Sequence, residues 1–172
     1  MAGLFSRLQK RSIGHHPYCT AVVVAAGSAS RMKGIDKIMT TLGGIPVLAR
    51  TLQALEQCGR IDEIVVVTRT DLCAPVNILC REFGIQKVTA VVSGGATRAE
   101  SVRCGLCAVS GRAELAAIHD GARPFVSQEL LERVLIAGAK TGAAAPAVPI
   151  KDTIKRAKDE VGGQAVLRKT SE

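Results

Sequence analysis

The sequence predicts an α/β fold in which a mostly parallel sheet carries helices on both faces. Short apolar runs typical of buried strands recur along the 172-residue chain, and segments with helical spacing of apolar residues separate them. Capping residues and glycines mark the ends of these segments. Strands that alternate with helices form parallel sheets through right-handed crossovers. The length suits one domain, and no internal repeat divides it.

Five segments are predicted as strands. Residues 20–25 combine β-branched and small apolar residues without a charge, as a strand buried on both faces requires. Residues 63–68 read Glu-Ile-Val-Val-Val-Thr and fit the same description. The remaining candidates are residues 87–92, 115–119 and 143–150.

Two helices are predicted between the first three strands. The first has Pro46 in its first turn and ends before Gly59. Its apolar face carries Val47, Leu48, Thr51, Leu52 and Leu55. The second covers residues 73–83 and ends at Gly84, a residue suited to a helix terminus.

Two further helices have clear starting signals. Thr97 and Glu100 have the spacing of a capping box, and we expect Val102, Leu106 and Val109 on the apolar side of the helix that follows. Ser127 is the predicted N-cap of the last helix. The inward residues of that helix are expected to be Leu130, Leu131, Val134 and Leu135.

Composition favours a small anionic ligand. The net charge is +8 and the pI is near 9.5, although part of this excess serves solubility alone. Aromatic residues make up only 2% of the chain, whereas proteins that bind single strands usually stack bases on aromatic rings. We therefore expect no nucleic-acid partner.

The six cysteines show no disulfide framework, and the chain has no secretory apolar segment, so reduced thiols and a cytoplasmic location are expected. Cys104 and Cys107 form a C-x-x-C pair, but nothing completes a zinc site around it. We expect two half-buried residues on a helix. Residues 1–17 are predicted to be a flexible basic tail, too short for a stable membrane anchor, before a domain at 18–172.

The first apolar strand leads into a candidate phosphate site. Ala25, Ala26 and Gly27 remove side-chain bulk where the chain turns, so that backbone N–H groups can approach a ligand. Arg31 and Lys37 then supply positive charge. The spacing matches neither a P-loop nor a G-x-G-x-x-G turn, and a tight structural connection would have the same composition.

Two further loops follow predicted strands. Residues 93–101 bring two glycines to a helix N-terminus, where free amides could read a base or hold an anion. Residues 119–124 place Asp120 beside a small-residue turn and Arg123. Because ligands bind at the carboxyl ends of parallel strands, the three loops should converge.

Asp120 has two interpretations. It could hold Mg²⁺ or a sugar hydroxyl, because Mg²⁺ takes one or two carboxylates together with phosphate oxygens. Alternatively, it forms a salt bridge with Arg123. Residues 151–156 place a hydroxyl among cations and are a fourth candidate, for which an ordinary exposed turn is equally suitable.

Four motifs together resemble the 2-C-methyl-D-erythritol 4-phosphate cytidylyltransferase family, from about residue 20 to the end of the chain. They are residues 25–32, 94–102, 119–124 and 148–155. The resemblance implies a Rossmann-like nucleotidyltransferase fold and a homodimer. It also implies Mg²⁺-dependent transfer of a cytidylyl group from CTP to methylerythritol phosphate, with release of pyrophosphate, in isoprenoid precursor synthesis.

The resemblance also implies roles for individual residues. Those matching the triphosphate loop are Ala25, Ala26, Gly27, Arg31 and Lys37, of which the two cations are catalytic. Those matching the segment that reads cytosine are Gly94, Gly95, Ala96, Arg98 and Ser101. Asp120, Arg123 and Thr153 match positions near the ribose, the metal and the second substrate, with Asp120 matching a nucleotide-binding, substrate-binding and metal-binding position.

The sequence departs from the family pattern at three places. Ala29 replaces a common glycine, and Gly121 replaces a usual alanine. The chain stops at Glu172, about where the family places an arginine that reaches the partner subunit, and before a lysine near the metal. We therefore expect a C-terminally truncated member. A cytidylyltransferase for another polyol phosphate, such as ribitol 5-phosphate, and a non-catalytic CTP-binding protein are the alternatives.

Overall fold

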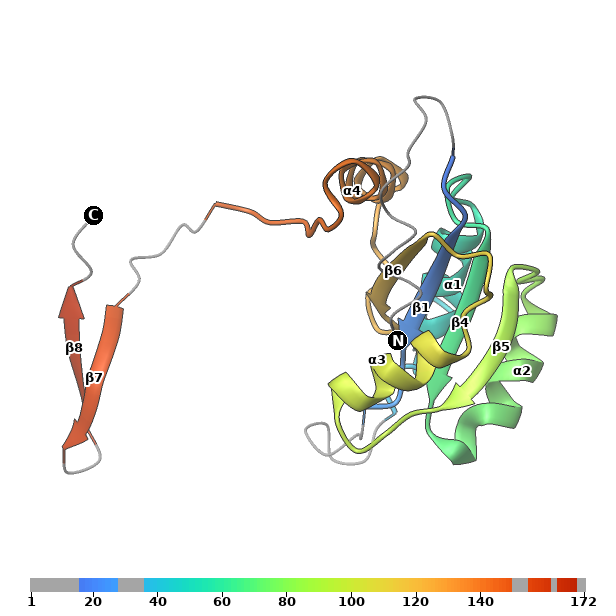
Figure 1. The fold of residues 1–172 in the computed structure, drawn as a ribbon. Coiled ribbons are helices and arrows are strands. Elements are labelled where there is room, and N and C mark those ends of the chain that lie inside the picture. The colour runs from blue at the N-terminus through green and yellow to red at the C-terminus, as the bar shows by residue number, and fades with distance from the viewer. Residues whose placement is uncertain (1–15, 28–35, 150–154, 162–163, 170–172) are drawn as a thin grey trace.

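Four parallel strands form the central sheet of the computed structural model, which describes residues 16–27, 36–149, 155–161 and 164–169. The strand order is β5-β4-β1-β6 (Figure 1), with each neighbouring pair parallel. The strands are β1 (Cys19–Val24), β4 (Glu63–Thr68), β5 (Val88–Ser93) and β6 (Leu115–Asp120). The α/β class is confirmed, and four predicted strands are correct to within one residue at each end.

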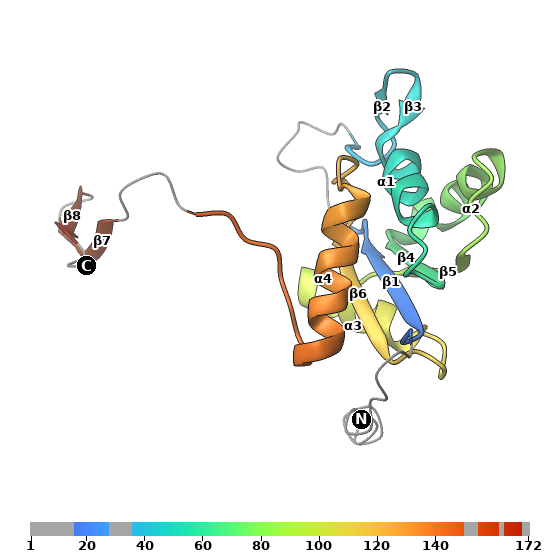
Figure 2. The ribbon, with the colours of Figure 1, turned by 90° about the horizontal axis from the view of Figure 1, so that it is seen from above.

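Helices cover both faces of this sheet. They are α1 (Val47–Glu56), α2 (Cys73–Glu82), α3 (Arg98–Cys107) and α4 (Gln128–Thr141). Figure 2 shows α1 and α3 on opposite sides of β1 and β4. The main core lies on the α1 side, where Ala21 and Val23 of β1 pack with buried residues of α1, α2 and α4.

The predicted helix ends are largely confirmed. The α1 helix begins at Val47, so Pro46 is its N-cap and not a residue of its first turn. Gly84 follows α2 with a φ of +64°. The Thr97 hydroxyl accepts from the Glu100 N–H at 3.1 Å, while the Glu100 carboxylate accepts from the Thr97 N–H at 3.1 Å. Ser127 Oγ accepts from the Leu130 N–H at 3.2 Å.

The predicted apolar side of α3 is only partly correct, since Val102 and Val109 are half-buried. Ser101 and Gly105 are the buried residues of this helix, whereas Leu106 is 41% exposed. A Cβ on Gly105 would lie 2.4 Å from Val22 Cγ1 and 2.7 Å from Val67 Cγ2. The helix therefore packs on the sheet through its small residues, because the backbone approaches too closely for larger ones.

The inward face of α4 follows the prediction more closely. Leu131 and Leu135 are buried in the main core, and Leu130 and Val134 are half-buried. On α1, the predicted residues Leu48, Thr51, Leu52 and Leu55 are all buried.

The predicted strand at residues 143–150 is also wrong over 143–149, which form no regular structure and are exposed, while residue 150 lies outside the described ranges. Pro146 and Pro149 have no N–H group to donate to a neighbouring strand, so the segment is poorly suited to a sheet interior. It leads toward a separate antiparallel hairpin, β7 (Lys155–Val161) and β8 (Gln164–Lys169), which was not predicted (Figure 1).

A short hairpin precedes α1 and was also not predicted. Its strands are β2 (Thr41–Leu42) and β3 (Ile45–Pro46). Gly43 and Gly44 form the two-residue turn with φ of +59° and +78°, a conformation that glycine adopts without steric cost.

Candidate nucleotide-binding site

The ends of the central strands are tied together by backbone hydrogen bonds. Ala25 follows β1 and donates its N–H to the Val67 carbonyl of β4 at 2.7 Å. Gly121 follows β6 and donates to the Val24 carbonyl at 2.8 Å. Gly94 follows β5 and donates to the Thr68 carbonyl of β4 at 2.8 Å, so the loops that leave β1, β5 and β6 start from one hydrogen-bonded edge.

The loops touch at positions that have little or no side chain. A Cβ on Gly94 would lie 2.5 Å from Ala26 Cβ and 2.7 Å from Ser101 Oγ. A Cβ on Gly121 would lie 2.8 Å from Ala25 Cβ. The described part of the first loop thus contacts the other two loops, as their position at the strand ends predicts.

The glycines of the second loop are held by internal hydrogen bonds. Gly94 donates its N–H to the Thr68 carbonyl at 2.8 Å, and Gly95 donates to Ser101 Oγ at 3.2 Å. The Ser101 hydroxyl is buried and donates to the Thr97 carbonyl at 3.0 Å. The expectation that both glycine amides are free for a ligand is therefore wrong, whereas Ala96 and Arg98 are exposed.

Asp120 connects the second and third loops through two arginines. Its Oδ1 accepts from Arg98 Nη2 at 3.0 Å and Nε at 3.2 Å, and its Oδ2 lies 2.8 Å from Arg123 Nε. The salt bridge with Arg123, one of the two interpretations drawn from the sequence, is thus present. Both guanidiniums are well exposed, at 62% and 74%, and ion pairs of this kind typically contribute only about 0–1 kcal/mol.

His119 supports the third loop. Its Nε2 lies 3.2 Å from the Arg123 carbonyl oxygen. Burial lowers the pKa of the imidazole below its usual value of 6.5, outweighing the hydrogen bond to Arg123 and the nearby Asp120 charge, which raise it. The side chain is therefore mainly neutral at pH 7 and adds no charge beside Asp120.

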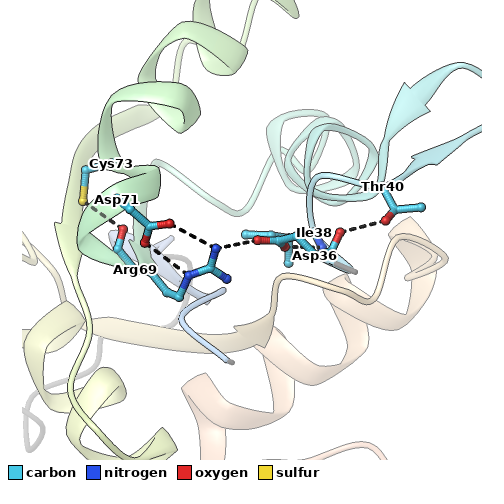
Figure 3. Close-up of polar contacts among 6 residues, drawn as sticks. All are labelled: Asp36, Ile38, Thr40, Arg69, Asp71 and Cys73. Atoms are coloured by element: carbon cyan, nitrogen blue, oxygen red, sulfur yellow. Dashed lines mark hydrogen bonds and ion pairs between the residues drawn. The ribbon is translucent and has the colours of Figure 1, made fainter. Parts of the chain in front are cut away.

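The predicted cations of the first loop are placed only in part. Arg31 lies outside the described residues, as does Thr153 of the fourth candidate segment. Lys37 is exposed, and its ammonium pairs with no residue in the described ranges. Its neighbour Asp36 lies beside Arg69, with Asp36 Oδ2 at 2.8 Å from Arg69 Nη2 (Figure 3).

Comparison with known families gives a single assignment. The model of the family described as 2-C-methyl-D-erythritol 4-phosphate cytidylyltransferase matches residues 19–172, which include the sheet and all three loops. The chain belongs to this cytidylyltransferase family.

Relatives and solved structures agree with the assignment. The 2-C-methyl-D-erythritol 4-phosphate cytidylyltransferase of Dehalococcoides mccartyi strain CBDB1 is 40% identical over 87% of this chain and 64% of its own length. A crystal structure of the 4-diphosphocytidyl-2C-methyl-D-erythritol synthase of Anaerococcus prevotii has a TM-score of 0.77 and 32% identity, over 91% of this chain and 64% of that one. Rv0371c of Mycobacterium tuberculosis has a TM-score of 0.56 and 25% identity, over 72% of this chain and 61% of that one. The chain thus spans less than two thirds of the relatives' length.

Asp120 fits a divalent ion in its donor chemistry. Magnesium prefers oxygen ligands and usually takes one or two carboxylates, with phosphate oxygens and water completing the shell. The Asp120 side chain is 31% exposed at the meeting point of the loops, and its present partners are exposed arginines that a ligand could displace. In the described ranges, no three His, Cys, Asp or Glu side chains gather around a point.

None of the six cysteines lies in the three loops, although the Cys73 thiol donates to the Arg69 carbonyl at 3.5 Å. All six are free thiols, and burial raises the pKa of Cys19 to about 12, with the nearby Asp62 and Cys58 adding to the rise. Cys104 is half-buried as expected, but Cys107 is exposed on α3, contrary to the prediction. No helix in the described part of the chain has the length and apolarity needed to cross a membrane.

Asp36 and Arg69 were not identified from the sequence. Arg69 directly follows the predicted strand 63–68, at the sheet edge where ligands bind, and this position is the signal that points to it. Its partner Asp36 is 33 positions away along the chain, and no spacing rule connects the two.

Proposed function

We propose that this chain transfers a cytidylyl group from CTP to 2-C-methyl-D-erythritol 4-phosphate, forming 4-diphosphocytidyl-2-C-methyl-D-erythritol and pyrophosphate in isoprenoid precursor synthesis. The proposal rests on one observation, that the described parts of three of the four family motifs meet at one edge of the sheet. Gly94 lies against Ala26 and Ser101, and Arg98 pairs with Asp120. These contacts bring the proposed triphosphate, base and ribose segments together.

The proposed reaction needs no side-chain nucleophile, because the sugar phosphate brings its own. A phosphate oxygen of methylerythritol phosphate attacks the α-phosphorus of CTP and forms the new P–O bond. The bond from the α-phosphorus to the oxygen bridging the β-phosphorus breaks, and pyrophosphate leaves with that electron pair. The protein contributes positioning and charge.

Backbone and cations of the first loop are proposed to hold the triphosphate. Ala25, Ala26 and Gly27 allow close approach, while Arg31 and Lys37 stabilise the charge that develops around the α-phosphate. Both reactants are anions, so these cations also offset their mutual repulsion.

The second and third loops are proposed to select the substrates. Gly94, Gly95 and Ser101 would shape the cytosine segment through their internal hydrogen bonds, and the solvent-exposed Ala96 and Arg98 would contact the base. Asp120 would accept from a ribose hydroxyl or hold the metal. Arg123 and Thr153 are assigned to methylerythritol phosphate.

We propose Mg²⁺ as the cofactor, held by Asp120 and the substrate phosphates. A bound divalent ion would neutralise phosphate charge and polarise the phosphoryl group. The structure of Rv0371c is that of a complex with manganese, which supports a divalent cation in this fold. The proposal also includes a homodimer and a cytoplasmic location, with no nucleic-acid partner and no stable membrane anchor. It divides the chain into a flexible basic tail at residues 1–17 and a catalytic domain over 18–172.

A pyrophosphate-release assay tests the proposal. The chain is incubated with Mg²⁺, CTP and methylerythritol phosphate, then with ribitol 5-phosphate as the acceptor and with UTP as the donor. Release that requires CTP and methylerythritol phosphate supports the proposal, and faster release with ribitol 5-phosphate contradicts the assigned substrate. Calorimetric titration with CTP completes the design, because binding without turnover identifies a non-catalytic CTP-binding protein instead.

A further inference from the structure

Both residues that flank Arg69 are hydrogen-bonded at the end of β5. The carbonyl of the preceding Thr68 accepts from the Gly94 N–H at 2.8 Å, and the Thr70 hydroxyl lies 2.7 Å from the Ser93 hydroxyl. A 3₁₀ turn, η3 (Thr70–Leu72), follows directly. The residue is therefore anchored beside the strand end from which the proposed cytosine segment starts.

The Arg69 side chain bridges two carboxylates, as Figure 3 shows. Its Nη2 lies 2.8 Å from Asp36 Oδ2, and its Nε donates to Asp71 Oδ1 at 3.2 Å. Asp36 and Arg69 are mostly buried, with exposed side-chain fractions of 24% and 30%, whereas Asp71 is 66% exposed. The contact to Asp36 is thus less screened by solvent than the contact to Asp71.

Asp36 organises the turn that follows it. Its Oδ1 accepts from the Ile38 N–H at 3.1 Å, and its carbonyl accepts from the Thr40 N–H at 2.9 Å and the Thr40 hydroxyl at 2.7 Å. Ile38 is buried in the core, and its carbonyl accepts from the Leu48 N–H at 2.9 Å. The backbone on both sides of Lys37 is therefore held, by the core after it and by Asp36 before it.

We infer that Arg69 is a positioning residue that holds Lys37 in place through Asp36. The inference rests on the proposed function, in which Lys37 acts on the CTP triphosphate. The ion pair connects the lysine's turn, outside the sheet, to the end of β4, which also carries the bonds to Ala25 and Gly94. Without Arg69, the carboxylate of Asp36 loses its cation, and the start of the turn is free to shift relative to the site.

Steady-state kinetics with CTP and methylerythritol phosphate test the catalytic consequence. We expect Arg69→Ala to lower kcat about 10-fold to 100-fold, as a displacement of about 1 Å does, with little change in the KM for the sugar phosphate. Arg69→Lys should recover part of the loss. Arg133→Ala is the matched control, because it removes an exposed arginine that pairs with Glu129 on the same helix at 3.7 Å. It should leave kcat and the melting temperature unchanged.

A double-variant cycle decides whether Arg69 acts through Lys37. Lys37→Ala alone should lower turnover by about 10² to 10³. If Arg69 acts by placing this lysine, adding Arg69→Ala to Lys37→Ala causes little further loss. Losses that multiply in full would overturn the inference, as would wild-type kcat in Arg69→Ala.

Amide hydrogen exchange gives a readout independent of turnover. Arg69→Ala should speed exchange at the amides of Ile38 and Thr40, while exchange in β4 and the melting temperature stay near wild-type values. Unchanged exchange at these amides overturns the positioning role. A wild-type chain without cytidylyl transfer overturns the proposed function and the catalytic part of the inference, and exchange still decides whether Arg69 holds the turn.

Discussion

Gly94→Ala tests whether contact between the loops is needed for activity. The added methyl carbon would lie 2.5 Å from Ala26 Cβ and 2.7 Å from Ser101 Oγ. Carbon atoms that are not bonded pack at about 3.5–4.0 Å, so the substitution demands a separation greater by about 1 Å. The substitution thus forces the proposed triphosphate and cytosine segments apart.

The structure indicates which side moves. Ser101 is buried on α3, and Gly105 of the same helix is packed closely against Val22 and Val67 of the sheet, so we expect α3 to stay in place. Ala26 lies at the start of the first loop and is only half-buried. We therefore expect the first loop to shift by about 1 Å, with a loss in kcat/KM of about 10-fold to 100-fold.

The assay is pyrophosphate release with CTP and methylerythritol phosphate, together with thermal unfolding. Gly111→Ala is the control, because a Cβ at this exposed glycine meets no atom within 4 Å. It should retain wild-type kinetics. Wild-type kcat/KM in Gly94→Ala would refute the idea that contact between the loops sets the geometry of the site.

Three further changes have defined outcomes. Arg31→Ala should lower turnover by about 10² to 10³ without loss of fold, and near-normal turnover in the release assay would remove its assigned role. Burial raises the Glu63 pKa, but hydrogen bonds from two threonines and a backbone N–H outweigh it, so the pKa is lowered from 4.5. The stability that ionised Glu63 contributes is therefore complete above its unfolded-state pKa of 4.5 and is lost as the pH falls through the lower folded-state pKa. In urea unfolding, Glu63→Gln should reduce the loss of unfolding free energy at acid pH. An unchanged pH profile would contradict this. Gly105→Ala should destabilise the fold by about 1–3 kcal/mol despite alanine's better helix propensity, and greater resistance to urea would show that Val22 and Val67 give way easily.

The parallel strands were predictable because their signal is local. Three valines end β1, residues 64–68 of β4 are all β-branched, and every residue of β4 is buried. A strand covered on both faces needs this composition whatever surrounds it, so the sequence alone defines it. Helix caps at Thr97 and Ser127 were predictable for the same reason, since their partners lie three residues away.

One error arises where the outcome depends on packing at a distance, and a second where local prolines outweigh apolar composition. The α3 helix has apolar residues on the side of Leu106, yet it packs on the sheet through Gly105. Its backbone lies so close to Val22 and Val67 that only a residue without a side chain fits there. Residues 143–149 are apolar enough for a strand, but their prolines remove the donors that a strand pairing would use. Periodicity does not reveal the packing of α3, whereas the two prolines are a local sequence signal that argued against the strand.

In the candidate site, the position of the loops was predictable from the sequence, but the role of the glycines was not. From sequence, Gly94 and Gly95 offer free amides to a ligand, but both N–H groups are bonded within the protein. Their lack of side chains instead lets the loops touch. Under the proposed function, recognition by hydrogen bonding and charge would depend mainly on exposed groups such as Arg98, which is held by Asp120. Because that ion pair is exposed and weak, a nucleotide that offers phosphate to the guanidinium and a hydroxyl or metal to the carboxylate can exchange both partners at little cost.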